Sequence, residues 1–197
     1  QVYAALQSAL MAMAEEGQLP DVITFAGNGE PTMHPDFEQI IEDTLALRDE
    51  YAPTAKISVL SNATQLHRAD VVRALKRVDN NILKLDSAFD DTVQLVNKPQ
   101  GAYTVARTVE LLKAFDGEFI LQTMFLRGEY LGRRVDNTTE EEVEAWLRLI
   151  KEIAPKQVMV YSLDRDTPCQ TLEKVEKEEL RQIAARVEAF GIACSVA

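Results

Sequence analysis

A short loop with two glycines, an amide and a carboxylate follows the first strongly apolar run of the chain. Residues 21–26 predict a strand, and Gly27, Asn28, Gly29 and Glu30 come directly after it. Glycine lets a ligand approach the backbone closely because no Cβ stands in the way, and a carboxylate accepts hydrogen bonds from an ammonium group. The sequence therefore predicts a ligand-binding loop at the end of this strand.

Polar side chains also follow the other predicted strands. In parallel strand-helix folds, ligands meet the loops at the carboxyl ends of the strands, so polar residues that recur there indicate a site. The residues that we select on this basis are Ser61, Asn62, Asp86, Ser87, Gln122, Thr123, Arg127 and the run 162–165. Each one alone is typical of a turn or a cap. Their recurrence at successive strand ends favours a shared binding site.

A lysine and an aspartate lie two positions apart in the third predicted strand. Strand alternation places Lys84 and Asp86 on one face, together with Ile82. A charged pair that faces into a core needs mutual pairing or a polar ligand, because an unpaired buried charge is costly. Two interpretations remain open, a structural ion pair and a ligand-binding pair.

The loop at residues 27–31 resembles the GGEP motif of radical S-adenosylmethionine (SAM) enzymes, with Asn28 in place of the usual second residue. Residues 84–88, followed by residues 96–99, are similar to a stretch in the radical SAM group that includes wyosine-type tRNA-modifying enzymes and many Fe-S oxidoreductases. Glycyl-radical-enzyme activases share the strand-end features more loosely. The resemblance extends over residues 22–168, and its more specific parts are the glycine loop and the lysine-aspartate strand.

The resemblance implies roles for the polar strand ends. The loop after the first strand would receive the amino group of SAM, and the next strand end would lie near the same part of the molecule. Residues 86 and 87 would face the ribose, residues 161–163 would border the adenine, and the fourth strand would contact the ribose or the carboxylate. The SAM-binding residues implied in this way are Gly27, Asn28, Gly29, Glu30, Ser61, Asn62, Asp86, Ser87, Gln122 and Arg127.

The cysteine content departs from the radical SAM pattern. Members of the family hold a 4Fe-4S cluster through three cysteines in a CxxxCxxC loop, and this chain contains only Cys169 and Cys194. We therefore expect a fragment whose first strand and cluster loop lie upstream of Gln1, and we assign no metal ligand or catalytic residue within it. Cys169 is a further candidate as a hydrogen-atom donor to a substrate radical. Two histidines, His34 and His67, are too few for a histidine-rich metal site.

In the complete enzyme, the resemblance implies reductive cleavage of SAM to a 5'-deoxyadenosyl radical, which abstracts hydrogen from a substrate. The electron would come from a donor such as flavodoxin or ferredoxin. The substrate, whether a small molecule, a protein or a tRNA, does not follow from the sequence. The isolated fragment is expected to be inactive.

The spacing of the apolar runs predicts an α/β fold. Strand-like runs recur every 25 to 40 residues with helix-like stretches between them, which is typical of a parallel sheet or barrel. The predicted strands are 21–26, 56–60, 81–86, 118–126, 157–163 and 192–196. An open doubly wound sheet is the alternative, but no GxGxxG follows a strand, which favours a partial (β/α)6 TIM-like barrel. The capping-box spacing of Thr138 and Glu141 predicts the start of one of the helices.

Composition indicates one domain across residues 1–197, since 46% hydrophobic content is enough for a single sizeable core. No apolar run approaches the length of a membrane span, and two cysteines suit a reducing compartment, so we expect a cytoplasmic protein. The formal net charge is −11, and this acidic balance disfavours nucleic acid as a partner of the segment.

Two other functions remain open at this stage. The chain could be a non-catalytic module that retains the SAM-binding fold. It could instead be a cluster-independent lyase or aldolase that uses Lys84 as a Schiff-base nucleophile, although Asp86 nearby would tend to keep that lysine charged.

Overall fold

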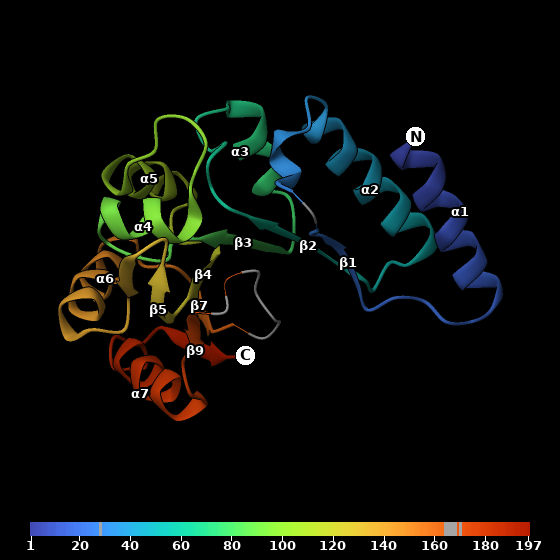
Figure 1. Cartoon of the computed structure of the whole chain (residues 1–197). Coiled ribbons are helices and arrows are strands. Elements are labelled where there is room, and N and C mark those ends of the chain that lie inside the picture. Colours follow the sequence, from blue (N-terminus) through green and yellow to red (C-terminus); the bar gives the residue numbers. More distant parts are fainter. Residues whose placement is uncertain (28, 164–168, 170) are drawn as a thin grey trace. The chain divides into compact units, whose positions relative to one another are not determined.

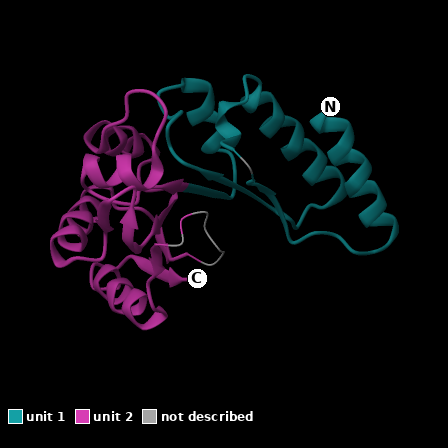
Figure 2. Ribbon diagram, viewed as in Figure 1, with its two compact units in different colours: residues 1–82 teal, residues 83–197 magenta. Residues whose placement is uncertain are grey.

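The computed structural model describes residues 1–27, 29–163, 169 and 171–197. The chain forms two compact units, residues 1–82 and residues 83–197 (Figure 2). The expectation of a single domain over residues 1–197 stays a prediction. Among the described residues, no helix has the length and apolar character needed to span a membrane.

Helices and strands alternate along both units, as the spacing of apolar runs predicts (Figure 1). The elements of the first unit are α1 (Val2–Glu15), β1 (Val22–Phe25), the short helix η1 (Pro31–Met33), α2 (Phe37–Tyr51), β2 (Lys56–Ser61) and α3 (Ala69–Leu75). Strand β3 (Asn80–Lys84) begins in the first unit and ends in the second. The elements of the second unit are α4 (Asp90–Asn97), α5 (Val105–Leu112), η2 (Lys113–Phe115), β4 (Ile120–Met124), β5 (Leu126–Tyr130), β6 (Arg133–Asp136), α6 (Glu140–Ile153), β7 (Gln157–Tyr161), β8 (Leu172–Lys174), α7 (Lys177–Glu188) and β9 (Ala193–Val196).

The main sheet has six strands in the order β1-β2-β3-β4-β7-β9. Strand β1 pairs in parallel with β2, and β7 pairs in parallel with both β4 and β9. All six predicted strands are present in this sheet, so the predicted parallel α/β fold is confirmed. The carboxyl ends of its strands carry the loops that hold most of the candidate residues.

The core of the first unit lies between the strands and the helices α1 and α2. Leu10, Leu47, Ala52 and Ala55 form a buried cluster against which Ile23 packs. In α1 only Leu10 is buried, so this helix is attached through a narrow stripe.

The core of the second unit contains most of the fully buried aromatic side chains. Phe125 and Trp146 meet edge to face, with ring centroids 5.3 Å apart. The indole Nε1 of Trp146 donates to Thr123 Oγ1, and Thr123 Oγ1 donates to the carbonyl of Leu85. This chain of bonds ties α6 to the ends of two strands, so the site-bearing edge of the sheet has a rigid base.

A small antiparallel sheet, in the order β6-β5-β8, lies in the second unit and is absent from the sequence-based expectation. The predicted strand 118–126 is wrong at its end, because β4 stops at Met124 and the chain enters the second sheet at Leu126. The switch occurs because Phe125 N donates to the carbonyl of Tyr161, and Leu126 N donates to Asn137 Oδ1. Arg127 therefore lies on β5 and not at the end of a strand of the main sheet.

Candidate functional site

The glycine loop of the first unit presents open backbone at the carboxyl end of β1. Gly27 and Gly29 have φ of 145° and 141°, a conformation that side chains disfavour. Apart from each glycine and its chain neighbours, no heavy atom of the described residues lies within 4 Å of the position that a Cβ would take. The loop lines a cavity of about 320 Å³ that extends from Thr24 to Pro31. A ligand can therefore reach the backbone here, while Asn28 lies outside the described residues.

The carboxylate of Glu30 is bonded mainly within the protein. Its Oε1 accepts hydrogen bonds from the backbone N and the hydroxyl of Thr32, at 3.1 and 2.5 Å. Its Oε2 accepts one from the backbone N of Asn62 at 2.6 Å. A carboxylate oxygen accepts about two such bonds, so Oε1 is saturated and Oε2 retains room for one donor. Glu30 thus shapes the loop and keeps limited capacity for a ligand ammonium.

Ser61 and Asn62 form the turn that follows β2. Ser61 Oγ accepts from the backbone N of Ala63, and Asn62 Oδ1 accepts from both the backbone N and the hydroxyl of Thr64. These side chains hold the turn in place. The structure brings the turn to the glycine loop through the bond from Asn62 N to Glu30.

Lys84 and Asp86 form an ion pair in the second unit, with Lys84 Nζ 3.1 Å from Asp86 Oδ2. The Asp86 side chain is fully buried, and its Oδ1 accepts from the backbone N of Met124 at 2.7 Å. Burial on its own lowers the pKa of Lys84, but the attraction of Asp86 and a hydrogen bond with Tyr161 outweigh it and raise this pKa above its usual value. Burial raises the pKa of the Tyr161 hydroxyl. The cluster therefore holds Lys84 as an ammonium.

Ser87 is buried and bonded to a helix of the same unit. Its hydroxyl donates to Glu142 Oε2 at 2.6 Å and accepts from the backbone N of Phe89. The other oxygen of Glu142 accepts from Thr92 at 2.5 Å. These contacts give Ser87 a structural role in fixing the loop after β3.

Asn137 is a buried polar residue that sequence reasoning did not select. Its Nδ2 donates to the carbonyls of Asp86 and Met124, at 2.9 and 2.7 Å, and its Oδ1 accepts from Leu126 N at 2.8 Å. It thereby fixes the ends of β3 and β4 and the start of β5. Nothing in the local sequence distinguishes it from an ordinary turn asparagine.

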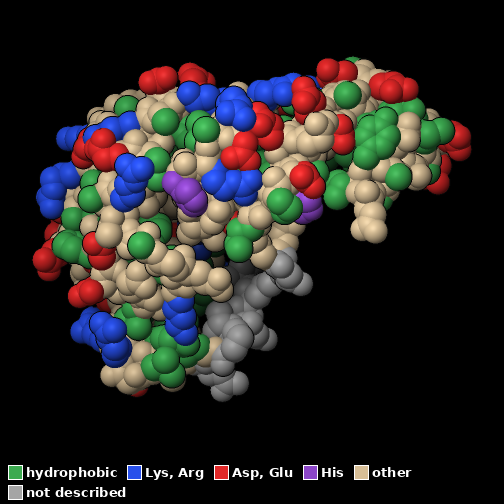
Figure 3. Space-filling model, turned by 90° about the horizontal axis from the view of Figure 1, so that it is seen from above, with side chains coloured by type: hydrophobic (Ala, Val, Ile, Leu, Met, Phe, Trp, Pro, Cys, Tyr) green, Lys and Arg blue, Asp and Glu red, His purple; other side chains and the backbone are tan. Residues whose placement is uncertain are grey.

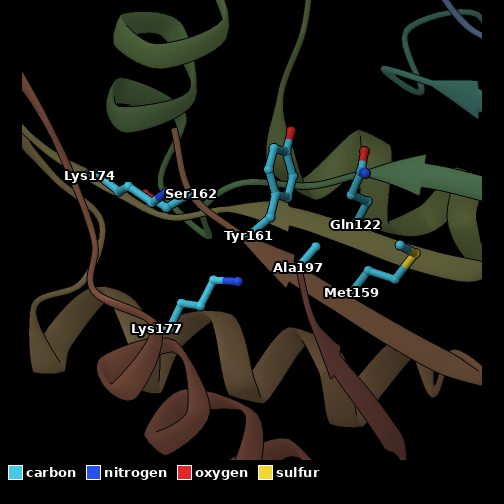
Figure 4. A pocket seen from close by; sticks show the side chains of 7 residues that line it. All are labelled: Gln122, Met159, Tyr161, Ser162, Lys174, Lys177 and Ala197. Atoms are coloured by element: carbon cyan, nitrogen blue, oxygen red, sulfur yellow. The ribbon is translucent and has the colours of Figure 1, made fainter. Parts of the chain in front are cut away.

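Gln122 lines a cavity of about 320 Å³ on the half-buried face of the main sheet in the second unit (Figure 4). Thr123 points to the opposite face, where it is buried against Trp146. Of these two neighbours, only Gln122 is available to a ligand in this cavity. The other residues that line it are Met159, Tyr161, Ser162, Lys174, Lys177 and Ala197.

Arg127 forms an ion pair with Glu179 of α7. It also lies opposite Asp136 in the small sheet. Burial alone would raise the pKa of the Asp136 carboxyl, but hydrogen bonds from Thr138, and to a smaller extent the charge of Arg127, lower this pKa below its usual value. Arg127 is therefore held by carboxylates of its own unit and is not among the described residues that line the Gln122 cavity.

The two cysteines do not fit a 4Fe-4S cluster. No CxxxCxxC is present in the 197 residues, and burial raises the pKa of the Cys194 thiol to about 12, which disfavours the thiolate that iron requires. Cys169 Sγ lies 3.1 Å from Thr171 Oγ1, beside residues 164–168, which are outside the description. Within the described ranges, no group of three or more His, Cys, Asp or Glu side chains is arranged to hold a metal ion.

Solved structures with this arrangement of strands and helices include a radical SAM protein. A radical SAM methyltransferase from Sphaerobacter thermophilus matches 99% of this chain with a TM-score of 0.74 at 16% identity, and the match covers 56% of that protein. Streptococcus suis SuiB bound to SAM matches 98% of the chain at a TM-score of 0.67 and 15% identity, over 43% of its own length. The chain has the radical SAM fold. A domain of pyruvate-formate lyase-activating enzyme from Bacteroides vulgatus matches 89% of it at a TM-score of 0.64 and 14% identity, over 98% of that domain.

Sequence relatives of this chain are more similar to it but longer. A UPF0026 protein of Synechocystis sp. is 32% identical over 155 residues, which are 76% of this chain and 53% of the relative. A protein named GTPase Obg, from Brachyspira hyodysenteriae, is 25% identical over 173 residues, which are 86% of this chain and 24% of the relative. The chain thus spans about half and about a quarter of these two relatives. No protein-family model matches it.

Proposed function

We propose that this chain is the SAM-binding core of a radical SAM enzyme. The observation that carries the proposal is the open loop at Gly27 and Gly29, shaped by Glu30 at the carboxyl end of β1, in a chain that has the radical SAM fold. In such enzymes SAM supplies a 5'-deoxyadenosyl radical that abstracts hydrogen from a substrate. SuiB, one of the structural neighbours, was solved with SAM bound.

The residues of this chain would bind and orient SAM. The space over Gly27 and Gly29 would admit the methionyl end of the molecule, and the remaining acceptor site on Glu30 Oε2 would take its ammonium group. Asn28 and the turn at Ser61 and Asn62 would border the same end. Because a loop held by several hydrogen bonds loses little freedom when a ligand binds, its pre-formed shape would favour affinity.

The candidates of the second unit divide into two groups. Gln122 lines an open cavity and is proposed to contact SAM or its reaction partner. Asp86 and Ser87 are 1% exposed, so we propose that they act near the ribose by positioning the loop after β3. Arg127, which is paired with Glu179, is proposed as a positioning residue as well.

Cluster ligands and the electron donor are proposed to come from outside these 197 residues, the donor being a protein such as flavodoxin or ferredoxin. We propose that the chain alone binds SAM but does not cleave it, and that the protein is cytoplasmic, where thiols stay reduced. The reading frame upstream of Gln1 tests the first point. A CxxxCxxC there, with iron and sulfide bound after anaerobic expression, supports the proposal, and a start codon at this point with no cysteines contradicts it.

Calorimetric titration of the 197-residue chain with SAM tests the binding function directly. Saturable binding that S-adenosylhomocysteine shares, and that Glu30→Ala weakens, is the expected result. A chain that does not bind SAM, although it is folded by circular dichroism, would be a module of another kind.

A Schiff-base lyase that uses Lys84 is disfavoured by a specific observation. A nucleophilic lysine needs a lowered pKa, whereas Asp86 and Tyr161 raise the pKa of Lys84. Nucleotide hydrolysis, suggested by the name of the Brachyspira relative, is not proposed either. The chain contains no GxxxxGK[ST] sequence to cradle phosphates.

A further inference from the structure

The cavity that contains Gln122 has a composition that the binding of SAM does not explain. It opens on the half-buried face of the main sheet, where Met159 lies opposite Gln122 in the register of β4 and β7. The start of α7 closes one side, and Figure 4 shows Lys177 extending from it toward Ala197. A volume of about 320 Å³ suits a small molecule rather than a polymer.

The polar groups of the cavity differ in how far they are already bonded. Ser162 Oγ donates to the carbonyl of Phe125 and accepts from Val175 N, so it is occupied. Tyr161 shares a hydrogen bond with Lys84. Among the described residues, neither the side-chain amide of Gln122 nor the ammonium of Lys177 has a hydrogen-bond or ion-pair partner. These two groups are therefore available to a ligand.

The described lining of the cavity is opposite in charge to the chain. The formal net charge of the chain is −11, whereas the described residues that line this cavity include two lysines and no carboxylate side chain. The glutamates that follow Lys177 are engaged elsewhere, because Glu178 pairs with Arg181 and Glu179 pairs with Arg127. Lys177 thus keeps its charge directed at the cavity, beside an apolar surface formed by Met159 and Ala197.

We propose that this cavity binds a small anionic molecule, a carboxylate or a phosphate ester with a short apolar body, and that Lys177 is its anion-binding residue. The inference rests on the proposed function, since it names the substrate class of the same enzyme. SAM itself is a poor occupant, because its sulfonium carries a positive charge that the ammonium of Lys177 would repel. Met159 and Ala197 would contact the apolar body, and the Gln122 amide would hydrogen-bond a polar group along it.

Methionine methyl resonances test this assignment without any turnover. The chain has five methionines, of which Met159 lines this cavity and Met33 follows the glycine loop. Titration of methyl-labelled protein with valerate or butyl phosphate should shift the Met159 signal, and valeramide, the neutral analogue, should not. If neither anion shifts Met159, or if valeramide binds as well as valerate does, the proposal is wrong.

Two charge variants on one helix supply the matched control. Lys177→Gln should weaken the binding of valerate about tenfold, since a charge-assisted hydrogen bond is lost. Arg181→Gln removes the same charge one turn further along α7, outside the cavity, and should change the affinity by less than about twofold. Equal affinity of Lys177→Gln and the unaltered protein would overturn the assignment.

A titration with SAM separates this inference from the proposed function. If SAM shifts only the Met33 signal, the result supports both the SAM site at the glycine loop and the assignment of the Gln122 cavity to another ligand. Shifts of Met159 that compete with valerate and disappear in Lys177→Gln would mean that the cavity binds the carboxylate of SAM, and the substrate assignment would fail. If SAM shifts neither signal, the proposed function fails, whereas the valerate result stands or falls by itself.

Discussion

The carboxylate of Glu30 accepts a hydrogen bond from the backbone N of Asn62 at 2.6 Å, which joins the loop after β1 to the turn after β2. The same carboxylate holds Thr32 through its other oxygen. One side chain therefore sets the shape of the loop and offers the remaining acceptor site for a ligand. Loss of that side chain should affect affinity more than a change at any other position in the loop.

Glu30→Ala is expected to lower SAM affinity at least tenfold, because the loop loses three hydrogen bonds and the acceptor for an ammonium group. Calorimetric titration measures the change. Glu38→Ala, which removes a partly exposed carboxylate of α2 that pairs with Arg73, is the matched control and should bind SAM normally. Unaltered affinity in Glu30→Ala would exclude our placement of the ligand.

Asp86→Ala is expected to destabilise the protein by about 3–5 kcal/mol, since it leaves Lys84 without its buried partner. It also leaves the backbone N of Met124 without an acceptor. The double variant Lys84→Met/Asp86→Asn should lose much less stability, because it removes both charges of the pair and keeps a side-chain oxygen that accepts from Met124 N. Urea unfolding gives both values, and equal losses would show that the ion pair matters little.

Stability should decline at alkaline pH because of the cluster around Lys84. The pKa of Lys84 in the folded protein is raised above the ordinary value of 10.5. The contribution of Lys84 to stability is therefore complete below pH 10.5 and is lost as the pH rises through the pKa of the folded protein. The raised pKa of Tyr161 acts in the same direction. Urea unfolding at successive pH values should show a shallower decline for Lys84→Met/Tyr161→Phe. The same decline in both proteins would place the titrating groups elsewhere.

Cys194 should be a slow nucleophile in the folded protein. Burial raises the pKa of its thiol to about 12, so little thiolate exists near neutral pH. In a Cys169→Ser background, alkylation by iodoacetamide should be about a hundredfold slower in the native state than in urea. Comparable rates in the two states would mean that this thiol is more accessible than its position on β9 indicates.

Gly128→Ala should disrupt the small antiparallel sheet. A Cβ at this position would lie 2.2 Å from the carbonyl oxygen of Thr171, and the φ of 128° is itself unfavourable for alanine. We expect a loss of more than about 2 kcal/mol in thermal or urea unfolding. Gly132 has a φ of 74°, but a Cβ at this position would meet open space. Gly132→Ala should therefore lower the free energy of unfolding by only about 1 kcal/mol. Equal costs would mean that β5 and β8 can separate easily.

The main sheet could be predicted from sequence because each of its strands is a local apolar run that ends in polar residues. The small sheet could not, because long-range bonds create it. Residues 118–126 are mostly apolar and show no break after Met124, and the bonds to Tyr161 and Asn137 end β4 at that residue. The hairpin between β5 and β6 also lacks the usual Asn-Gly signal, since its two-residue turn is Leu131 and Gly132, with φ of 50° and 74°.

Local spacing also misplaced one helix start. The predicted capping residue was Thr138, but the structure uses Thr139, whose hydroxyl accepts from Glu142 N. Thr138 is unavailable because Asp136 Oδ1 already accepts from its backbone N and its hydroxyl. Two adjacent threonines have the same intrinsic preference for the N-cap position, so the neighbouring Asp136 decides which of them caps the helix.

Charged side chains of both signs alternate over the face shown in Figure 3, without a continuous basic area on that face. The expectation from composition that nucleic acid is a disfavoured partner of the segment stays a prediction.

Asn137 bonds to the chain after β3, to the end of β4 and to the first residue of β5, so the main sheet and the small sheet share one buried amide. Neither sheet can open at this point without exposing the hydrogen bonds of the other. The small sheet should accordingly unfold together with its neighbour as one cooperative foldon. In native-state hydrogen exchange, the amides of Met124 and Leu126 would then be released by the same opening event, although they belong to different sheets.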